Sequence, residues 1–204
     1  GATGDRTVQV DQSRQMSSSD IGSDIFNRAN PGSQAYVSTA AEAAAGTAQF
    51  GTVSVTPGSP NIGKNFKLQF ESDPATGNMG YRVITTDPNA NPPVPPVINP
   101  APPTAPTAYT PDAAIDFGGV SVVVKGTPQN GDVIDVESVQ SANVDIFNTL
   151  DNLIKTLDSP IAGDPVALAK LNNELATANK KLSTNYDNVQ TVAASVGARM
   201  NELE

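Results

Sequence analysis

The spacing of apolar side chains changes along the chain and separates regions of different character. Residues 1 to about 30 are polar, apart from a short alternating stretch at residues 7–10 that predicts one strand. Residues 31–137 alternate apolar and polar side chains over short stretches, as strands do. From about residue 140, apolar side chains recur every three or four residues, which predicts helices. The pattern therefore predicts an α+β fold.

The clearest strand signal is the alternation of Phe66, Leu68 and Phe70 with polar side chains, which puts three large apolar groups on one face. Residues 81–85 predict its neighbour, across a turn at residues 73–78. Shorter signals elsewhere predict three more strands, at Val53 and Val55, residues 120–125 and residues 132–136. The last two flank a loop with an Asn-Gly pair, which tolerates positive φ, so we expect them to form a hairpin.

Two segments of this region are ambiguous. Residues 40–45 are rich in alanine and favour a helix by propensity alone, although the segment is short and a glycine follows. Residues 88–111 contain ten prolines and cannot enter a sheet interior, because proline donates no backbone hydrogen bond. We expect a solvated loop there, rather than a ligand for an SH3-type groove, since no basic residue flanks it. Its deletion is expected to be tolerated, because long loops add little closure entropy.

Two helices are expected in the C-terminal third. The first carries apolar side chains at helical spacing after Asn143, a candidate N-cap. Its apolar positions are Val144, Ile146, Phe147, Leu150, Leu153, Ile154 and Leu157. Asp164 followed by Pro165 is a start signal for the second helix, which has no further proline up to residue 204.

The second helix repeats apolar side chains every seven residues, with companions three or four residues later. We call the following eight positions the helix-packing seam, the candidate functional residues of the chain: Leu168, Leu171, Leu175, Leu182, Val189, Val196, Met200 and Leu203. Such regularity is typical of a long packed helix. Leu182→Asp is therefore expected to destabilise it, because a packed seam does not accommodate an unpaired carboxylate.

The chain has too few helical partners for this seam. A helix of about 39 residues rises roughly 58 Å, whereas one of about 15 residues covers only roughly 22 Å. We therefore expect that the chain is an excised piece, and that removed segments or other subunits supply further helices. A single bundle within the chain is the alternative.

Composition limits the chemistry. The chain has no Cys and no His and a net charge of −9, which exclude thiolate or imidazole metal sites and disfavour nucleic-acid and membrane partners. Its apolar runs are too short to span a bilayer, and no secretory signal is present. No P-loop, dinucleotide fingerprint, nucleophile elbow or calcium loop occurs. Paired carboxylates could act as glycosidases do, but solvated acids are the favoured interpretation.

Several stretches, in order along the chain, resemble the flagellin-like family of axial flagellar proteins. The most informative are Gly-Thr-Pro-x-x-Gly-Asp at residues 126–132 and Val-Gly-Ala-Arg-x-Asn-Glu-Leu at residues 196–203. The others are residues 4–10, 22–26, 115–120 and 144–150.

The resemblance implies a rod-like domain, D1, made of long antiparallel helices, with a β-rich domain, D2, inserted into it. D1 would comprise residues 1–30 and 138–204, and D2 residues 31–137 with a Pro-rich loop at 88–111. It also implies that residues 40–45 are extended, and that the protein is no enzyme and needs no cofactor.

The implied function is a structural subunit at the junction of hook and filament in the bacterial flagellum. Arg6 and Arg199 favour it over a flagellin filament subunit, and a glycan-binding surface domain is a more distant alternative. The implied partners are the first hook-associated protein, flagellin and copies of the chain in a ring, while this fragment alone would be a monomer. Export by the flagellar apparatus would make it extracellular.

Overall fold

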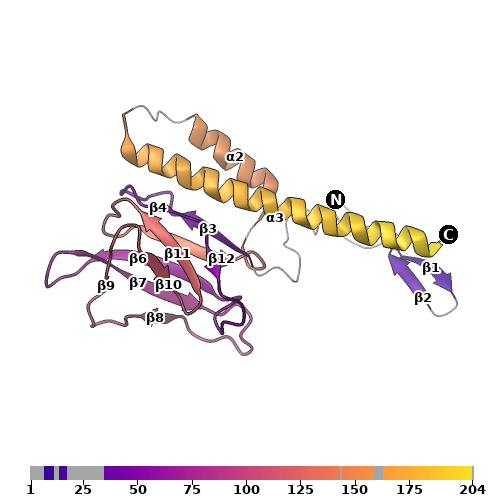
Figure 1. Cartoon of the computed structure of the whole chain (residues 1–204), viewed down its shortest axis with the longest axis horizontal. Coiled ribbons are helices and arrows are strands. Elements are labelled where there is room, and N and C mark those ends of the chain that lie inside the picture. Colours follow the sequence, from indigo (N-terminus) through magenta and orange to yellow (C-terminus); the bar gives the residue numbers. More distant parts are fainter. Residues whose placement is uncertain (1–6, 12–13, 18–34, 143, 159–162, 204) are drawn as a thin grey trace.

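The structure is a computed structural model and describes residues 7–11, 14–17, 35–142, 144–158 and 163–203. These residues form three sheets and two helices. The expected strand at residues 7–10 is confirmed as β1 (Thr7–Asp11), which pairs antiparallel with β2 (Arg14–Ser17). This pair lies toward the C-terminal end of α3, away from the other two sheets (Figure 1).

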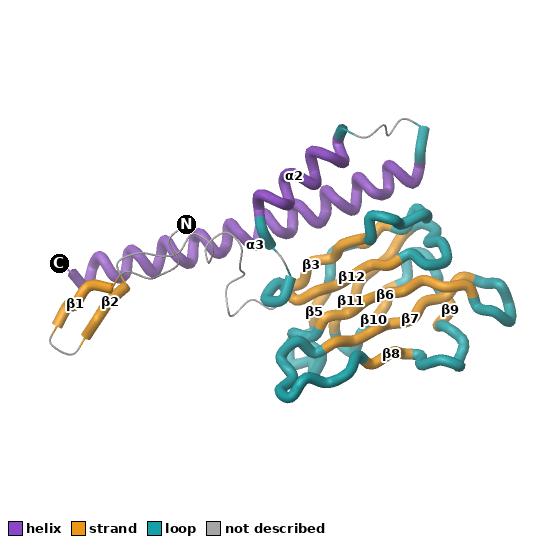
Figure 2. Tube along the Cα trace, turned by 180° about the vertical axis from the view of Figure 1, so that it is seen from behind, coloured by secondary structure: helices purple, strands orange, loops and turns teal. Residues whose placement is uncertain are grey.

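The two larger sheets pack face to face and form a sandwich (Figure 2). The six-stranded sheet has the order β3-β12-β6-β7-β8, with β9 also on β7. Its strands are β3 (Tyr36–Ala40), β6 (Asn65–Ser72), β7 (Met79–Thr86), β8 (Val97–Asn99), β9 (Thr107–Ala108) and β12 (Val133–Ser138). The four-stranded sheet contains β4 (Gln49–Phe50), β5 (Ser54–Val55), β10 (Ala114–Asp116) and β11 (Val120–Lys125).

The core of the sandwich is made by the alternating positions that the sequence singled out. Phe66, Leu68 and Phe70 of β6 are buried and face Val120 and the other buried valines of β11. Full burial of each such side chain stabilises the fold by about 1.5–3 kcal/mol. The expected pairing of residues 66–70 with 81–85 is confirmed, with Leu68 opposite Val83.

The expected hairpin of residues 120–125 and 132–136 is wrong. Both segments are strands, but β11 pairs with β4, β5 and β10, whereas β12 pairs with β3 and β6. The loop between them crosses from one sheet to the other. Asp132, 4% exposed, fixes the crossing, because its carboxylate accepts hydrogen bonds from the backbone N–H groups of Ala45, Gly46 and Gln129 at 2.8, 3.0 and 2.8 Å.

The two ambiguous segments are resolved. Residues 40–45 form no helix, in agreement with the family resemblance and against propensity, since Ala40 ends β3 and residues 41–45 form a turn and loop tied to Asp132. The Pro-rich segment is not entirely a solvated loop, because β8 and β9 lie within it. Proline is excluded from sheet interiors but not from edges, and both strands are edge strands.

The two expected helices are present as α2 (Ile146–Leu157) and α3 (Pro165–Leu203). α3 starts as predicted, with the Asp164 carboxylate accepting from the N–H groups of Val166 and Ala167 at 2.8 and 3.2 Å. The N-cap of α2 is Asp145 and not Asn143, which lies outside the described residues. Asp145 accepts from Phe147 N and Asn148 N at 2.8 and 3.3 Å.

Candidate assembly surface

The helix pair carries most of the exposed large apolar side chains of the described residues. α2 lies beside the N-terminal half of α3, and α3 extends beyond the end of α2 (Figures 1 and 2). None of the helices in the described part is both long and apolar enough to cross a membrane. Within the same residues, no group of metal-ligating side chains is large enough to hold an ion.

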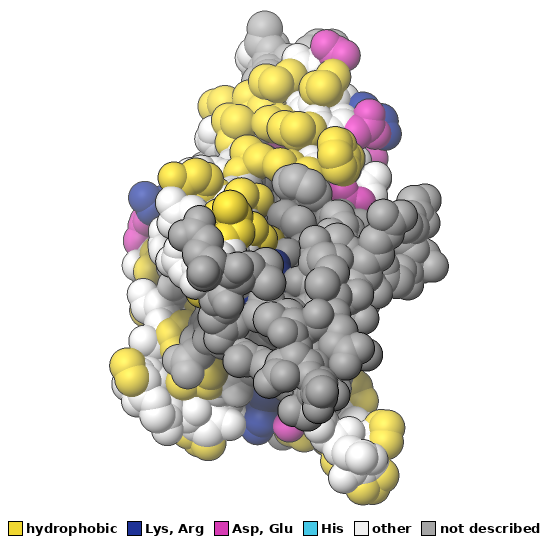
Figure 3. Space-filling view, turned by 90° about the vertical axis from the view of Figure 1, so that its right-hand side faces the viewer, with side chains coloured by type: hydrophobic (Ala, Val, Ile, Leu, Met, Phe, Trp, Pro, Cys, Tyr) yellow, Lys and Arg dark blue, Asp and Glu magenta, His cyan; other side chains and the backbone are white. Residues whose placement is uncertain are grey.

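α2 presents an apolar stripe to solvent. Phe147, Leu150, Ile154 and Leu157 recur at three- and four-residue spacing, and all are exposed, Phe147 by 70%. We call these four residues the outer stripe of α2. Hydrophobic side chains gather at the top of the molecule, over the helix pair (Figure 3). A stripe of this kind is typical of a helix that packs against another helix.

The helix-packing seam of α3 is also largely uncovered. Leu168 is 48% exposed and Val189 38% exposed, and Leu175, Val196 and Met200 are exposed as well. Leu171 and Leu182 are half-buried, while the side chain of Leu203 lies outside the described residues. The seam is therefore not enclosed by the described residues, and its packing against another helix stays a prediction.

The face of α3 away from the seam is buried, and the sequence analysis missed it. Its side chains are small or polar: Ala169, Asn173, Thr177, Thr184 and Asn188. Asn and Thr are modest helix formers, and their recurrence at a spacing of about four residues was the available signal. Heptad analysis of apolar residues alone passes over such a face.

Hydrogen bonds to strand backbone hold this polar face against the six-stranded and four-stranded sheets. Asn173 Nδ2 donates to the carbonyl oxygen of Ala48 at 2.9 Å, and its Oδ1 accepts from Phe50 N at 3.2 Å. The amide therefore pairs with β4 as a neighbouring strand would. Thr177 Oγ1 donates to the carbonyl oxygen of Ser38 on β3 at 2.7 Å.

A second amide fixes the start of α2. Asn185 Nδ2 donates to the carbonyl oxygens of Val144, at 2.6 Å, and Lys181, at 3.0 Å. Val144 is itself buried. Asn185 Oδ1 is buried and has no hydrogen-bond partner among the described residues. The contact ties the middle of α3 to the chain that enters α2.

Glu137 of β12 and Lys181 of α3 are two charged side chains that influence each other's pKa. Burial, and next the neighbouring Asp135, raise the pKa of Glu137 above its ordinary value, while Lys181 acts in the opposite direction. Burial lowers the pKa of Lys181, against the attraction of Glu174, Glu137 and Asp145. Burial thus disfavours the charged forms of both Glu137 and Lys181 at this contact.

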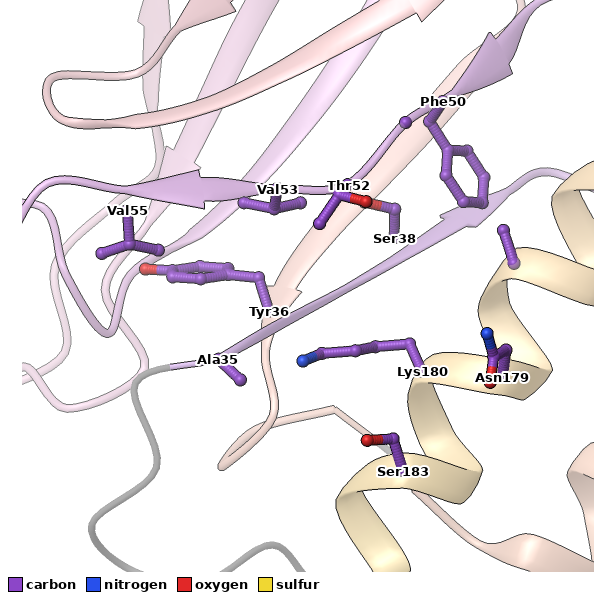
Figure 4. A pocket seen from close by; sticks show the side chains of 12 residues that line it. Ala35, Tyr36, Ser38, Phe50, Thr52, Val53, Val55, Asn179, Lys180 and Ser183 are labelled. Atoms are coloured by element: carbon purple, nitrogen blue, oxygen red, sulfur yellow. The ribbon is translucent and has the colours of Figure 1, made fainter.

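A cleft of about 600 Å³ lies between α3 and the strands β3, β4 and β5. Tyr36, Val53 and Val55 form its apolar wall, and the side chain of Lys180 extends from α3 into it (Figure 4). Among the residues that the structure describes, the lining contains no carboxylate, imidazole or thiol.

Known proteins resemble the chain in structure more than in sequence. No family profile and no curated protein matches it. The flagellar junction protein FlgL of Legionella pneumophila matches with a TM-score of 0.70 and 26% identity, covering 100% of this chain and 60% of that one. FlgL of Xanthomonas campestris, in space group C2, matches with a TM-score of 0.68 and 21% identity, over 100% of this chain and 59% of that one.

A further match is the flagellar hook associated protein-3 of Legionella pneumophila, with a TM-score of 0.65, 24% identity, and 100% and 59% coverage. The resemblance that the sequence motifs indicated is confirmed: the whole chain is similar to these junction proteins. It spans about three fifths of their length.

Proposed function

We propose that this chain is the central part of a structural subunit that joins the hook to the filament of the bacterial flagellum. The likeness of the entire chain to FlgL from two bacteria carries this proposal. No observation favours the flagellin or glycan-binding alternatives. The subunit would work mechanically and not as an enzyme.

We propose the domain division that the family likeness implied. Residues 1–30 and 138–204 would belong to a rod-like D1 domain, and residues 31–137 to an inserted β-rich D2 domain. The element order supports this division, because both large sheets come from residues 36–138 and both described helices follow them. The polar face of α3 would then be the contact between the two domains.

The rod would transmit force through helix packing. The helix-packing seam and the outer stripe of α2 both expose apolar side chains along the helix pair. Helices from the rest of the subunit would cover them, since burial of such stripes drives long helices to associate. The seam would run most of the roughly 58 Å that about 39 helical residues span.

The proposed partners are the first hook-associated protein on one side, flagellin on the other, and copies of the subunit in a ring. The fragment alone would be a monomer, because the ring contacts would need the complete subunit. A stable ring of the fragment in light scattering would contradict this. The subunit would be exported by the flagellar apparatus and act outside the cell.

Deletion of the gene in the bacterium that encodes the chain tests the function. We expect complete hooks without filaments, with flagellin released into the medium, and restoration of filaments by the intact gene. Normal filaments in the deletion strain would overturn the proposal. Loss of the hooks themselves would also overturn it, because it would place the protein earlier in assembly.

A further inference from the structure

The outer edge of β7 is covered by the Pro-rich segment, which runs back along it in the antiparallel direction. β8 covers one half of this edge and β9 the other. The pairs are Thr85 with Val97, Ile84 with Ile98, Val83 with Asn99, Tyr81 with Thr107 and Gly80 with Ala108. The N–H of Tyr109 also donates to the carbonyl oxygen of Met79 at 3.0 Å. We call residues 87–109 the strap.

Between the two paired stretches, residues 100–106 leave the edge, and the side chain of Arg82 holds this excursion. Arg82 Nη1 donates to the carbonyl oxygen of Pro100 at 2.5 Å, and Nη2 to that of Thr104 at 2.7 Å. Nε donates to Glu71 Oε1 at 2.6 Å. Arg82 is only 9% exposed, so opening of the strap would leave its donors without these acceptors.

Two more contacts fix the far end of the strap. Pro106 packs so closely on Gly80 that a Cβ at Gly80 would lie 2.9 Å from the proline ring. The Tyr109 ring meets Phe70 edge-on at 5.4 Å, and its hydroxyl lies 3.1 Å from the carbonyl oxygen of Val124. The strap is thus built into the sandwich at both ends of the β7 edge.

An uncovered β7 edge would pair readily with another strand. The carbonyl of Met79 points toward the strap, so the alternate residues Tyr81, Val83 and Thr85 also turn their backbone groups to that side. β7 is rich in residues that favour strands, and Arg82 is its only charge. Such an edge is a template for strand addition.

The outer edge of the strap is poorly suited to the same pairing. β8 has three residues and lies between Pro96 and Pro100. Prolines supply no N–H, and short strands pair weakly. Both features are common in edge strands that resist pairing with another strand. The strap therefore covers the long edge of β7, and the edge that remains open consists of the short strands β8 and β9.

We propose that the strap is an edge guard, which blocks the addition of a strand from a second copy of this chain to β7, and that Arg82 holds it closed. The added strand would come from a second copy of the chain, because two β7 strands can pair antiparallel about a twofold axis. Each β7 would then hydrogen-bond the exposed edge of the other. The proposal does not depend on the flagellar role. Deletion of residues 88–111, which looked tolerable from the sequence, would uncover this edge.

Amide hydrogen exchange on the intact chain tests the role of Arg82. Arg82→Met removes all three donors, and we expect exchange at residues 97–109 to quicken by about tenfold or more while β6 and β11 stay protected. Lys67→Met is the matched control, since Lys67 lies on β6 on the same face of the sheet, is more exposed than Arg82 and pairs with Asp135 at 3.6 Å. Unchanged exchange in Arg82→Met would overturn the holding role.

Replacement of residues 90–105 by a short Gly-Ser linker tests the guard itself. This variant keeps β9, Pro106 and Tyr109 but uncovers the half of the β7 edge that β8 covers. We expect it to dimerise in sedimentation or light scattering at concentrations where the unmodified chain does not. A synthetic peptide of residues 94–105, added in trans, should return it to the monomer. A variant that stays monomeric, or a dimer that the peptide leaves intact, would overturn the proposal.

Discussion

The side-chain amide of Asn173 on α3 hydrogen-bonds the backbone of Phe50 on β4, 123 residues away in sequence. Phe50 N–H donates to Asn173 Oδ1, while Asn173 Nδ2 donates to the carbonyl oxygen of Ala48. The Asn173 side chain thus hydrogen-bonds backbone groups at the edge of the four-stranded sheet. This contact fixes the position of the sandwich along α3.

Asn173→Ala is expected to lower the free energy of unfolding by about 1–3 kcal/mol, because it leaves a buried donor and acceptor without partners. Urea denaturation measures the change. Asn172→Ala is the matched control, since Asn172 is exposed and donates to the side chain of Gln49 at 3.2 Å. A loss at Asn172 as large as that at Asn173 would contradict the bridging role.

Asp132→Ala is expected to be more costly, at about 3 kcal/mol or more, because three backbone N–H groups lose a charged acceptor. Asp116→Ala is the comparison. Asp116 also accepts from two backbone N–H groups, those of Gly118 and Gly119, but in an exposed turn. If both variants melt alike, Asp132 does not hold the crossing between the sheets.

The stability of the chain should depend on Glu137 in the weakly acidic range. Its pKa is raised in the folded state, so the group adds stability that is fully present below pH 4.5 and is lost as the pH rises through the raised pKa. Glu137→Gln should remove this part of the decline. Unfolding free energies of both proteins between pH 4 and neutrality provide the test, and parallel curves would contradict it.

Val189→Asp should leave the stability of this chain within about 0.5 kcal/mol of the original, because Val189 is exposed here. In the complete subunit the same change should cost several kcal/mol, since the seam would be packed. Leu182→Asp is less decisive, because Leu182 is half-buried in the chain itself. A large loss from Val189→Asp in the isolated chain would mean that the seam already packs within it.

The sequence predicted strands better than their partners. Alternation at Phe66, Leu68 and Phe70 determines which face is buried, and the structure agrees. Alternation at residues 120–125 and 132–136 was equally clear, yet it does not specify which strand pairs with which. The hairpin failed because Asp132 anchors the connection to Ala45 and Gly46, a contact between residues far apart in the chain.

The helix starts also show that local sequence is not sufficient where a tertiary contact decides. Asp164 and Pro165 left no competing start, and α3 begins there. Asn143 and Asp145 are both good capping residues, and local sequence could not choose between them. Burial of Val144 and its bond to Asn185 place that residue before the helix, so Asp145 is the cap.

Of the two faces of α3, the sequence predicted the apolar helix-packing seam but not the buried polar face. A seven-residue repeat of leucine and valine is a strong signal, whereas the buried face of α3 is built from Asn, Thr and Ala. Asn173 and Thr177 are buried with backbone groups of residues 38, 48 and 50 as hydrogen-bond partners, and these contacts depend on the tertiary fold.

Electron microscopy of cells that carry Val189→Asp in the complete subunit tests the central claim most directly. If the seam is the packing surface of a junction subunit, we expect hooks without filaments, whereas the neighbouring exposed change Gln190→Asp should leave filaments of normal length. Filaments of normal length on Val189→Asp cells would contradict the account.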